Sequence, residues 1–130
     1  MPFVQSRTPG QLNLGELIGE LEGCNPSHPV EYDFCGFEPD LAQMGSYRGF
    51  YEQMYIGYKD GGNPITVATM ILILKTSIGN KMTGYKGGSY NIDQLTPVWV
   101  SRYGSSRGSK IIGVTDVDGT VVLNTMYEPD

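Results

Sequence analysis

The eleven residues from Lys81 to Asn91 have the types and spacing that could cradle a nucleotide. They include three glycines, two tyrosines and two lysines. Glycine lets a ligand approach the backbone closely, aromatic faces stack on flat rings, and lysine attracts phosphate. The same composition is typical of a tight strand-turn-strand corner, so the segment supports both interpretations.

Positive charge is concentrated near this segment, although the chain as a whole is acidic. The formal net charge is −5, yet four of the nine lysines and arginines fall between Lys86 and Lys110. Arg48 lies among aromatic residues, and Arg102 and Arg107 lie in a glycine- and serine-rich stretch. Arginine suits bidentate contact with phosphate. The alternative is that these residues only keep loops soluble.

No complete catalytic set is visible in the sequence. Asp116 and Asp118, in Asp-Val-Asp-Gly-Thr, look like the nucleophile motif of haloacid-dehalogenase-type phosphatases, but only ten residues follow Thr120. The stretch is more simply a hairpin turn. His28 is the only histidine and precedes Pro29 in a loop, where we expect it to be solvated.

Paired carboxylates are the remaining candidates for acid-base chemistry. Glu31 alternates with Asp33, and Glu38 alternates with Asp40. Alternating acids of this kind usually form the wet face of a strand. We therefore expect no catalytic residue, no enzyme activity and no cofactor.

The two cysteines, Cys24 and Cys35, lie eleven residues apart. That spacing matches no zinc pattern, so no metal site is predicted. Free thiols in a reducing cytosol are the simpler interpretation, and a disulfide between them stays open.

Length and composition indicate one soluble domain. The chain has 130 residues, of which 39% are hydrophobic and 18% charged. Its acidic balance argues against binding to duplex nucleic acid, although one local basic pocket can still hold phosphate. The start of the chain lacks the features of a signal peptide, and the longest apolar run, Met70–Leu74, is too short to span a bilayer. We expect a cytoplasmic protein with no membrane contact.

Two helices are expected to position these residues. Asn13 and Glu16 form a capping box for the first helix, which Gly23 ends. Thr66 caps the second, which Gly79 ends. The apolar faces are Leu14, Leu17, Ile18 and Leu21 in the first helix and Val67, Met70, Ile71, Leu74 and Ile78 in the second, widened by Leu72 and Ile73.

The other segments predict strands. We expect strands over 29–35, 48–58, 81–85, 88–93 and 97–103, with a loop through Gly36, Pro39 and Gly45 after the first. Val98 and Val100 should face one way and Trp99 the other. Strands over 110–117 and 120–126 should form a hairpin with a type I′ turn at Asp118-Gly119. The fold class is therefore α+β: two helices packed on one face of a mainly antiparallel sheet, with a flexible arm over 1–12 and a single domain over 12–130.

Three ordered blocks resemble a family of small bacteriophage proteins. They are Ser46-Tyr47-Arg48-Gly49-Phe50-Tyr51, Thr83-Gly84-Tyr85-Lys86-Gly87-Gly88 and Thr96-Pro97-Val98-Trp99-Val100. The resemblance runs across roughly residues 12 to 125 and is to the phage anti-Thoeris sponge proteins. These non-catalytic proteins sequester the cyclic ADP-ribose-type signal of a bacterial Thoeris immune system, some also hold cyclic oligonucleotides, and they assemble as homodimers or higher homo-oligomers.

The resemblance implies a ligand site on the matching blocks. Met82 stands where the family often has an aromatic residue that stacks on the base. Asn91 would hydrogen-bond a ribose or base edge, and one of Arg102, Arg107 and Lys110 would contact phosphate. The expected ligand-binding residues are therefore Arg48, Met82, Tyr85, Lys86, Gly87, Asn91, Arg102, Arg107 and Lys110. A protein-binding phage inhibitor or accessory factor of a host enzyme is the alternative function.

Overall fold

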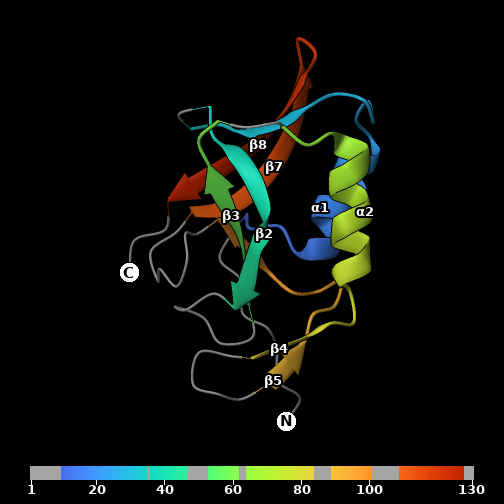
Figure 1. Ribbon diagram of the computed structural model, residues 1–130, viewed down its shortest axis with the longest axis vertical. Coiled ribbons are helices and arrows are strands. Elements are labelled where there is room, and N and C mark those ends of the chain that lie inside the picture. The colour runs from blue at the N-terminus through green and yellow to red at the C-terminus, as the bar shows by residue number, and fades with distance from the viewer. Residues whose placement is uncertain are drawn as a thin grey trace.

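The computed structural model describes residues 10–34, 36–46, 53–61, 64–83, 89–100 and 109–127. Within them the chain forms two helices and eight strands (Figure 1). The helices are α1 (Leu14–Glu22) and α2 (Val67–Ser77). The strands are β1 (Val30–Tyr32), β2 (Glu38–Ser46), β3 (Met54–Lys59), β4 (Lys81–Thr83), β5 (Ser89–Asn91), β6 (Val98–Val100), β7 (Ser109–Val117) and β8 (Thr120–Tyr127).

Six of the strands form one strongly curved sheet, and the α+β prediction is confirmed. The order is β1-β8-β7-β6-β3-β2. β1 pairs with β8 and β3 with β6 in parallel, whereas the other three pairings are antiparallel. The two end strands come together, because the Tyr32 amide donates to the Phe37 carbonyl at 2.8 Å and β1 contacts β2. The sheet is therefore nearly closed.

Both helices begin where the sequence predicts. The Asn13 side chain accepts from the Glu16 amide at 2.8 Å, and the Glu16 carboxylate accepts from the Asn13 amide at 3.0 Å, which completes the capping box of α1. Thr66 Oγ1 accepts from the Thr69 amide at the start of α2. The predicted broad apolar face of α2 is wrong at Leu72, which is 66% exposed because it lies on the side of the helix away from the core.

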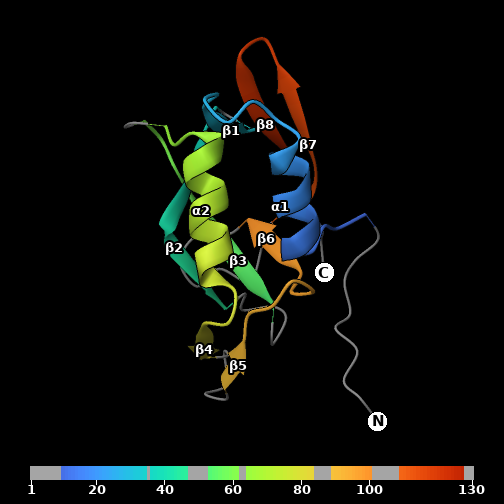
Figure 2. The same cartoon turned by 90° about the vertical axis from the view of Figure 1, so that its right-hand side faces the viewer.

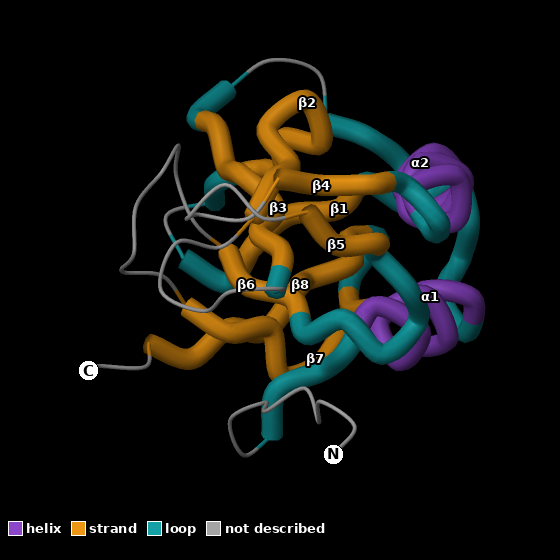
Figure 3. Tube along the Cα trace, turned by 90° about the horizontal axis from the view of Figure 1, so that it is seen from below, coloured by secondary structure: helices purple, strands orange, loops and turns teal. Residues whose placement is uncertain are grey.

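The helices lie side by side against one face of the sheet (Figures 2 and 3). The core between them contains the apolar faces of α1 and α2 and the inward residues of five strands. Leu12 also belongs to this core and Gln11 is buried, so the last residues of the predicted arm are packed onto the domain. Residues 1–9 lie outside the described residues.

The β7–β8 hairpin has the predicted turn. Asp118 and Gly119 have φ values of 53° and 80°, the positive pair that a type I′ turn requires. The Asp-Val-Asp-Gly-Thr stretch thus lies in a hairpin, as its simpler interpretation predicted.

The loop predicted through Pro39 and Gly45 is wrong, because both residues belong to β2. Proline is tolerated there since β2 is an end strand of the sheet. Gly45 faces the ring of Tyr55 in β3, and a Cβ at Gly45 would lie 2.9 Å from that ring. Glycine at this position therefore makes room for an aromatic neighbour and does not break the strand. The strand predicted over 48–58 begins at Met54 in the described part of the chain.

Candidate ligand-binding site

Trp99 lies on the face of the sheet that carries no helix. Its neighbours Val98 and Val100 belong to the core under the helices, and side chains alternate along a strand, so Trp99 points the opposite way, as predicted. Its side chain is nevertheless only 1% exposed. The indole Nε1 donates a 2.6 Å hydrogen bond to Oε1 of Gln53, which is also buried.

Strand register adds Tyr55 and Lys110 to this face. Tyr55 of β3 and Lys110 of β7 are the pairing partners of Trp99 on either side. Lys110 is only 3% exposed and interacts with other residues of the chain. We call Gln53, Tyr55, Trp99 and Lys110 the Trp99 layer. Buried polar groups on a helix-free face are more informative than buried apolar ones, because they are costly unless they are hydrogen-bonded.

The Trp99 layer adjoins the ends of two segments that carry predicted arginines. Residues 47–52 connect β2 to Gln53, and residues 101–108 connect β6 to β7. Both segments lie outside the described residues, but their attachment points belong to strands that meet at Trp99. The predicted site residues in these segments are Arg48, Arg102 and Arg107.

The predicted glycine corner lies on a separate two-stranded sheet, β4–β5. Met82 pairs with Tyr90, and Asn91 is exposed opposite Lys81. This hairpin lies at the end of the molecule away from the β7–β8 turn (Figures 1 and 2) and contacts β2. Two of the predicted site residues therefore lie on different sheets: Asn91 is on the two-stranded sheet and Lys110 is on the six-stranded sheet. The other three predicted residues of the corner, Tyr85, Lys86 and Gly87, lie outside the described residues.

Sequence reasoning missed Gln53 and the burial of Trp99. Strand alternation correctly predicts that Trp99 points away from Val98 and Val100. The neighbouring residues give no sign that the face without helices is buried. The available signal was the rarity of tryptophan: a single indole in the chain is seldom left in water.

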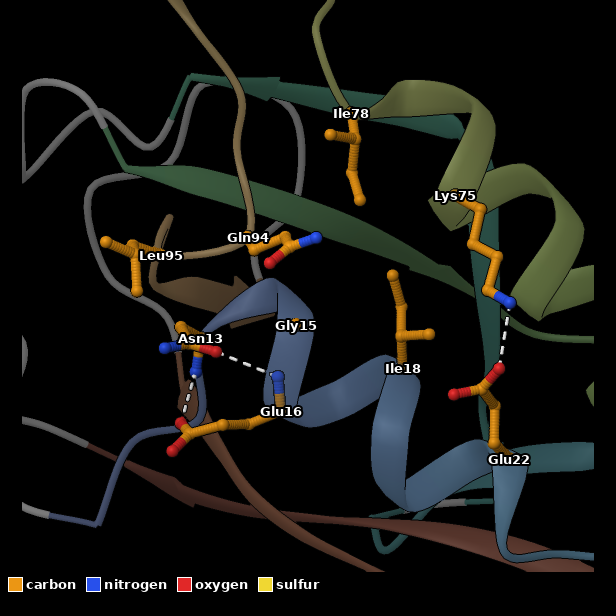
Figure 4. Close-up of a pocket in the computed structure, with 9 residues that line it drawn as sticks. All are labelled: Asn13, Gly15, Glu16, Ile18, Glu22, Lys75, Ile78, Gln94 and Leu95. Atoms are coloured by element: carbon orange, nitrogen blue, oxygen red, sulfur yellow. Dashed lines mark hydrogen bonds and ion pairs between the residues drawn. The ribbon is translucent and has the colours of Figure 1, made fainter.

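A groove of about 620 Å³ lies between the two helices and the 93–96 turn (Figure 4). Ile18 and Ile78 form its apolar middle, and Gln94 points between them. Lys75 closes one end with a 2.8 Å ion pair to Glu22. The groove offers apolar contact more than phosphate contact, because its one lysine is already paired. The lining residues are Asn13, Gly15, Glu16, Ile18, Glu22, Lys75, Ile78, Gln94 and Leu95.

His28 is not simply solvated, because it pairs with Asp116 across 88 positions of sequence. Its Nδ1 lies 2.7 Å from Asp116 Oδ1, and the Asn25 amide donates to Asp116 Oδ2 at 2.9 Å. The Asn25 hydrogen bond and then the His28 hydrogen bond lower the pKa of Asp116. The pair thus fastens the loop after α1 to the β7–β8 hairpin.

Cys24 lies in the same neighbourhood but is a poor nucleophile. Burial raises the pKa of its thiol, and the charges of Asp116 and Glu20 raise it further. The thiol also donates to the Glu20 carbonyl at 3.4 Å. Because a thiolate is the reactive form, this environment favours the free thiol that is present and does not activate it.

We expect Asp116→Asn to lower the melting temperature near neutral pH. The folded pKa of Asp116 is lowered, so its contribution to stability is complete above the unfolded value of about 3.9 and is lost as pH falls through the folded pKa. The difference between variant and parent should therefore shrink below about pH 4. Thermal unfolding followed by circular dichroism from pH 2 to 7 measures it.

Asp118→Asn is the matched control for this prediction. It removes the same charge from the same hairpin, and asparagine tolerates the positive φ of residue 118. A melting-temperature loss in Asp116→Asn that persists undiminished at the lowest pH would contradict the assignment.

Comparison of the chain with protein-family models, with curated proteins and with solved structures finds no match. Neither α1 nor α2 is long and apolar enough to cross a membrane. Among the described residues, no cluster of three or more histidines, cysteines and carboxylates is arranged to hold a metal ion.

Proposed function

We propose that this protein binds and sequesters a cyclic nucleotide-derived immune signal, and that it acts as a non-catalytic phage anti-defence protein in the cytoplasm of the infected bacterium. The ligand is of the cyclic ADP-ribose type, with cyclic oligonucleotides as further members of the class. The resemblance of the three sequence blocks supports this proposal, as does one structural observation, the Trp99 layer.

The Trp99 layer supports the proposal because it lies on the strands to which two arginine-bearing segments are attached. The Trp99–Gln53 hydrogen bond connects β6 to the residue that follows the 47–52 segment, and Lys110 follows the 101–108 segment by two positions. A site whose supporting residues are locked by packing and hydrogen bonds loses less entropy when it binds. Arginine is the residue type that suits a ligand with several phosphates, because it forms bidentate hydrogen bonds with them.

Calorimetry followed by ligand recovery tests the proposal. The protein is titrated with cyclic ADP-ribose isomers and cyclic dinucleotides, then heated, and the released ligand is identified by mass spectrometry. We expect tight uptake and an intact ligand. A cleaved ligand would show that the protein is an enzyme, and no uptake of any nucleotide would refute sequestration.

Arg107→Ala and Asn91→Ala are expected to weaken ligand binding about tenfold or more, since each removes a hydrogen-bonding group from a charged or polar ligand. Neither should lower the melting temperature, because Asn91 is exposed and Arg107 is expected to contact ligand. Lys75→Ala is the control, as it removes an exposed cation on α2. Unchanged affinity in both variants would show that the pocket lies elsewhere.

A protein-binding inhibitor of a host enzyme is the second candidate. It is favoured by two apolar side chains on the helical side, Leu72 and Leu95, which are 66% and 67% exposed. Leu72→Ser and Leu95→Ser should leave nucleotide uptake unchanged if sequestration is the function.

A further inference from the structure

We infer that the groove between α1 and α2 is the docking site of this chain's own residues 1–9, with the Phe3 side chain seated between Ile18 and Ile78. Residues 1–9 lie outside the described residues and join the domain at Gly10. We call them the 1–9 segment. Its docking is independent of nucleotide binding and concerns the helical face of the domain.

The groove has room for an apolar side chain and surfaces that match one. Its volume is about 620 Å³, and Ile18 and Ile78 point toward each other across its middle (Figure 4). Leu95 lines one end and is 67% exposed. An aromatic side chain placed here removes these apolar surfaces from water, which is favourable in proportion to the area covered.

The groove does not favour an anion, although α1 begins in it. The Leu14 and Gly15 amides donate to carbonyls of the 93–96 turn at 2.9 and 2.8 Å. The Asn13 side chain accepts from the Glu16 amide at 2.8 Å. A helix N-terminus binds phosphate or carboxylate through its free amides, and these amides already have partners. The groove therefore favours an uncharged, apolar occupant.

The start of the 1–9 segment is held on the domain beside the groove. The Gln11 Nε2 donates to the Val98 carbonyl at 3.1 Å, and the Leu12 amide donates to the Ile111 carbonyl at 2.8 Å. Gly10 has a φ of 80°, a conformation in which glycine lets the chain turn sharply. The next residue after Leu12 is a lining residue of the groove. The segment therefore begins a few residues from the surface that it would cover.

The 1–9 segment is long enough to reach every part of the groove. Phe3 precedes Gly10 by seven residues, which span up to roughly 23–25 Å when extended. The helix that borders the groove, α1, has 9 residues and is about 14 Å long. Because this docking occurs within one chain, its effective concentration is on the order of millimolar, which favours the chain's own segment over that of a second copy.

The composition of the 1–9 segment suits an apolar groove. Phe3 and Val4 are adjacent large apolar side chains, and Arg7 is the only charged side chain of the segment. The two prolines of the segment favour an extended chain, which is the form in which proline-containing segments lie in grooves.

Gln94 gives the groove a polar group that suits an extended main chain. Its side chain points between Ile18 and Ile78 (Figure 4), and it makes no side-chain hydrogen bond within the described ranges. A carboxamide both donates and accepts, as does the backbone of an extended chain. Gln94 can therefore pair with the main chain next to Phe3.

Charge also favours the 1–9 segment. The groove lining has two carboxylates, Glu16 and Glu22, and one ammonium, Lys75, so it is net negative and Arg7 brings the opposite charge. The side chains of Glu22 and Lys75 are 50% and 52% exposed, so this contact orients the segment more than it stabilises it. Glu38, by contrast, is only 7% exposed, so the expectation that it lies on the wet face of a strand is wrong.

Nuclear Overhauser effects measured on the full chain test the docking. With labelled phenylalanine rings and isoleucine methyl groups, we expect contacts from the Phe3 ring to the methyl groups of Ile18 and Ile78. Phe3→Ser identifies the Phe3 signals and should remove these contacts. A Phe3 ring without contact to the groove would overturn the inference. In an isotope-filtered experiment on mixed labelled and unlabelled protein, contacts between copies would overturn the assignment to the chain's own segment.

Melting temperatures give a second, independent measurement. Phe3→Ser should lower the melting temperature by roughly 3–5 °C, the shift for the loss of a small apolar contact in a chain of this size. The loss should shrink in a Leu95→Ser background, because the contact is then already weakened. Leu72→Ser is the matched control, since Leu72 is 66% exposed but does not line the groove. Equal losses from Phe3→Ser in the parent and in both backgrounds would overturn the docking.

Discussion

Trp99→Ala is expected to lower the free energy of unfolding by about 3–5 kcal/mol, the range for removing a large buried aromatic side chain. The indole is 1% exposed and forms the centre of the Trp99 layer. A domain of this size has a total stability of about 5–15 kcal/mol, so the substitution should remove at least about a fifth of it. Urea unfolding followed by circular dichroism measures the loss, since Trp99 is the only tryptophan and the variant has no indole fluorescence.

Trp99→Phe separates the hydrogen bond from the packing. It keeps an aromatic ring but leaves Oε1 of Gln53 without the indole donor, which should cost about 1–3 kcal/mol. Adding Gln53→Leu to Trp99→Phe removes the acceptor as well and should recover part of that loss. Losses that simply add in the double variant would contradict a direct Trp99–Gln53 bond.

The sequence predicts those elements whose signals are local. Asn13 and Glu16 are three positions apart and cap α1 as expected, and Asp118-Gly119 alone specifies the type I′ turn. Both signals act within one turn of backbone, so no knowledge of the rest of the chain is needed. The two helices and the β7–β8 hairpin could therefore be derived in advance.

The sequence does not predict strand β2. Its proline and glycine usually interrupt a strand, and here they are tolerated because of residues and strands that are distant in the sequence. Pro39 is tolerated only because no strand pairs on its free side, and Gly45 is required by the Tyr55 ring. The same holds for function-bearing contacts. The His28–Asp116 pair and the burial of Glu38 depend on strand order, which composition and periodicity do not contain. The predicted phosphate-binding residues therefore stay predictions, apart from the observed burial of Lys110.

Gly57→Ala is expected to destabilise the protein by about 1–3 kcal/mol, the usual cost of overpacking a filled site. Gly57 lies in the middle of β3, and an added Cβ would stand 2.6 Å from Gln43 Cβ and 3.1 Å from the Gln43 carbonyl. That distance is too short for two carbons, so the β2 bulge between Asp40 and Met44 must shift. Thermal unfolding followed by circular dichroism measures the effect.

The control for Gly57→Ala is to make the same substitution in proteins that also carry a substitution at Gln43. Gln43→Gly removes the clashing Cβ and should reduce the cost of the added methyl group, whereas Gln43→Ala keeps that Cβ and should not. Gly19→Ala is the matched glycine control, since a Cβ there meets nothing within 4 Å and should stabilise α1 by about 0.5–1 kcal/mol. The loss of stability from Gly57→Ala could instead be the same with glutamine, glycine or alanine at position 43. That result would show that residue 43 does not lie against Gly57, and the pairing register that places Glu38 opposite Lys59 would then be wrong.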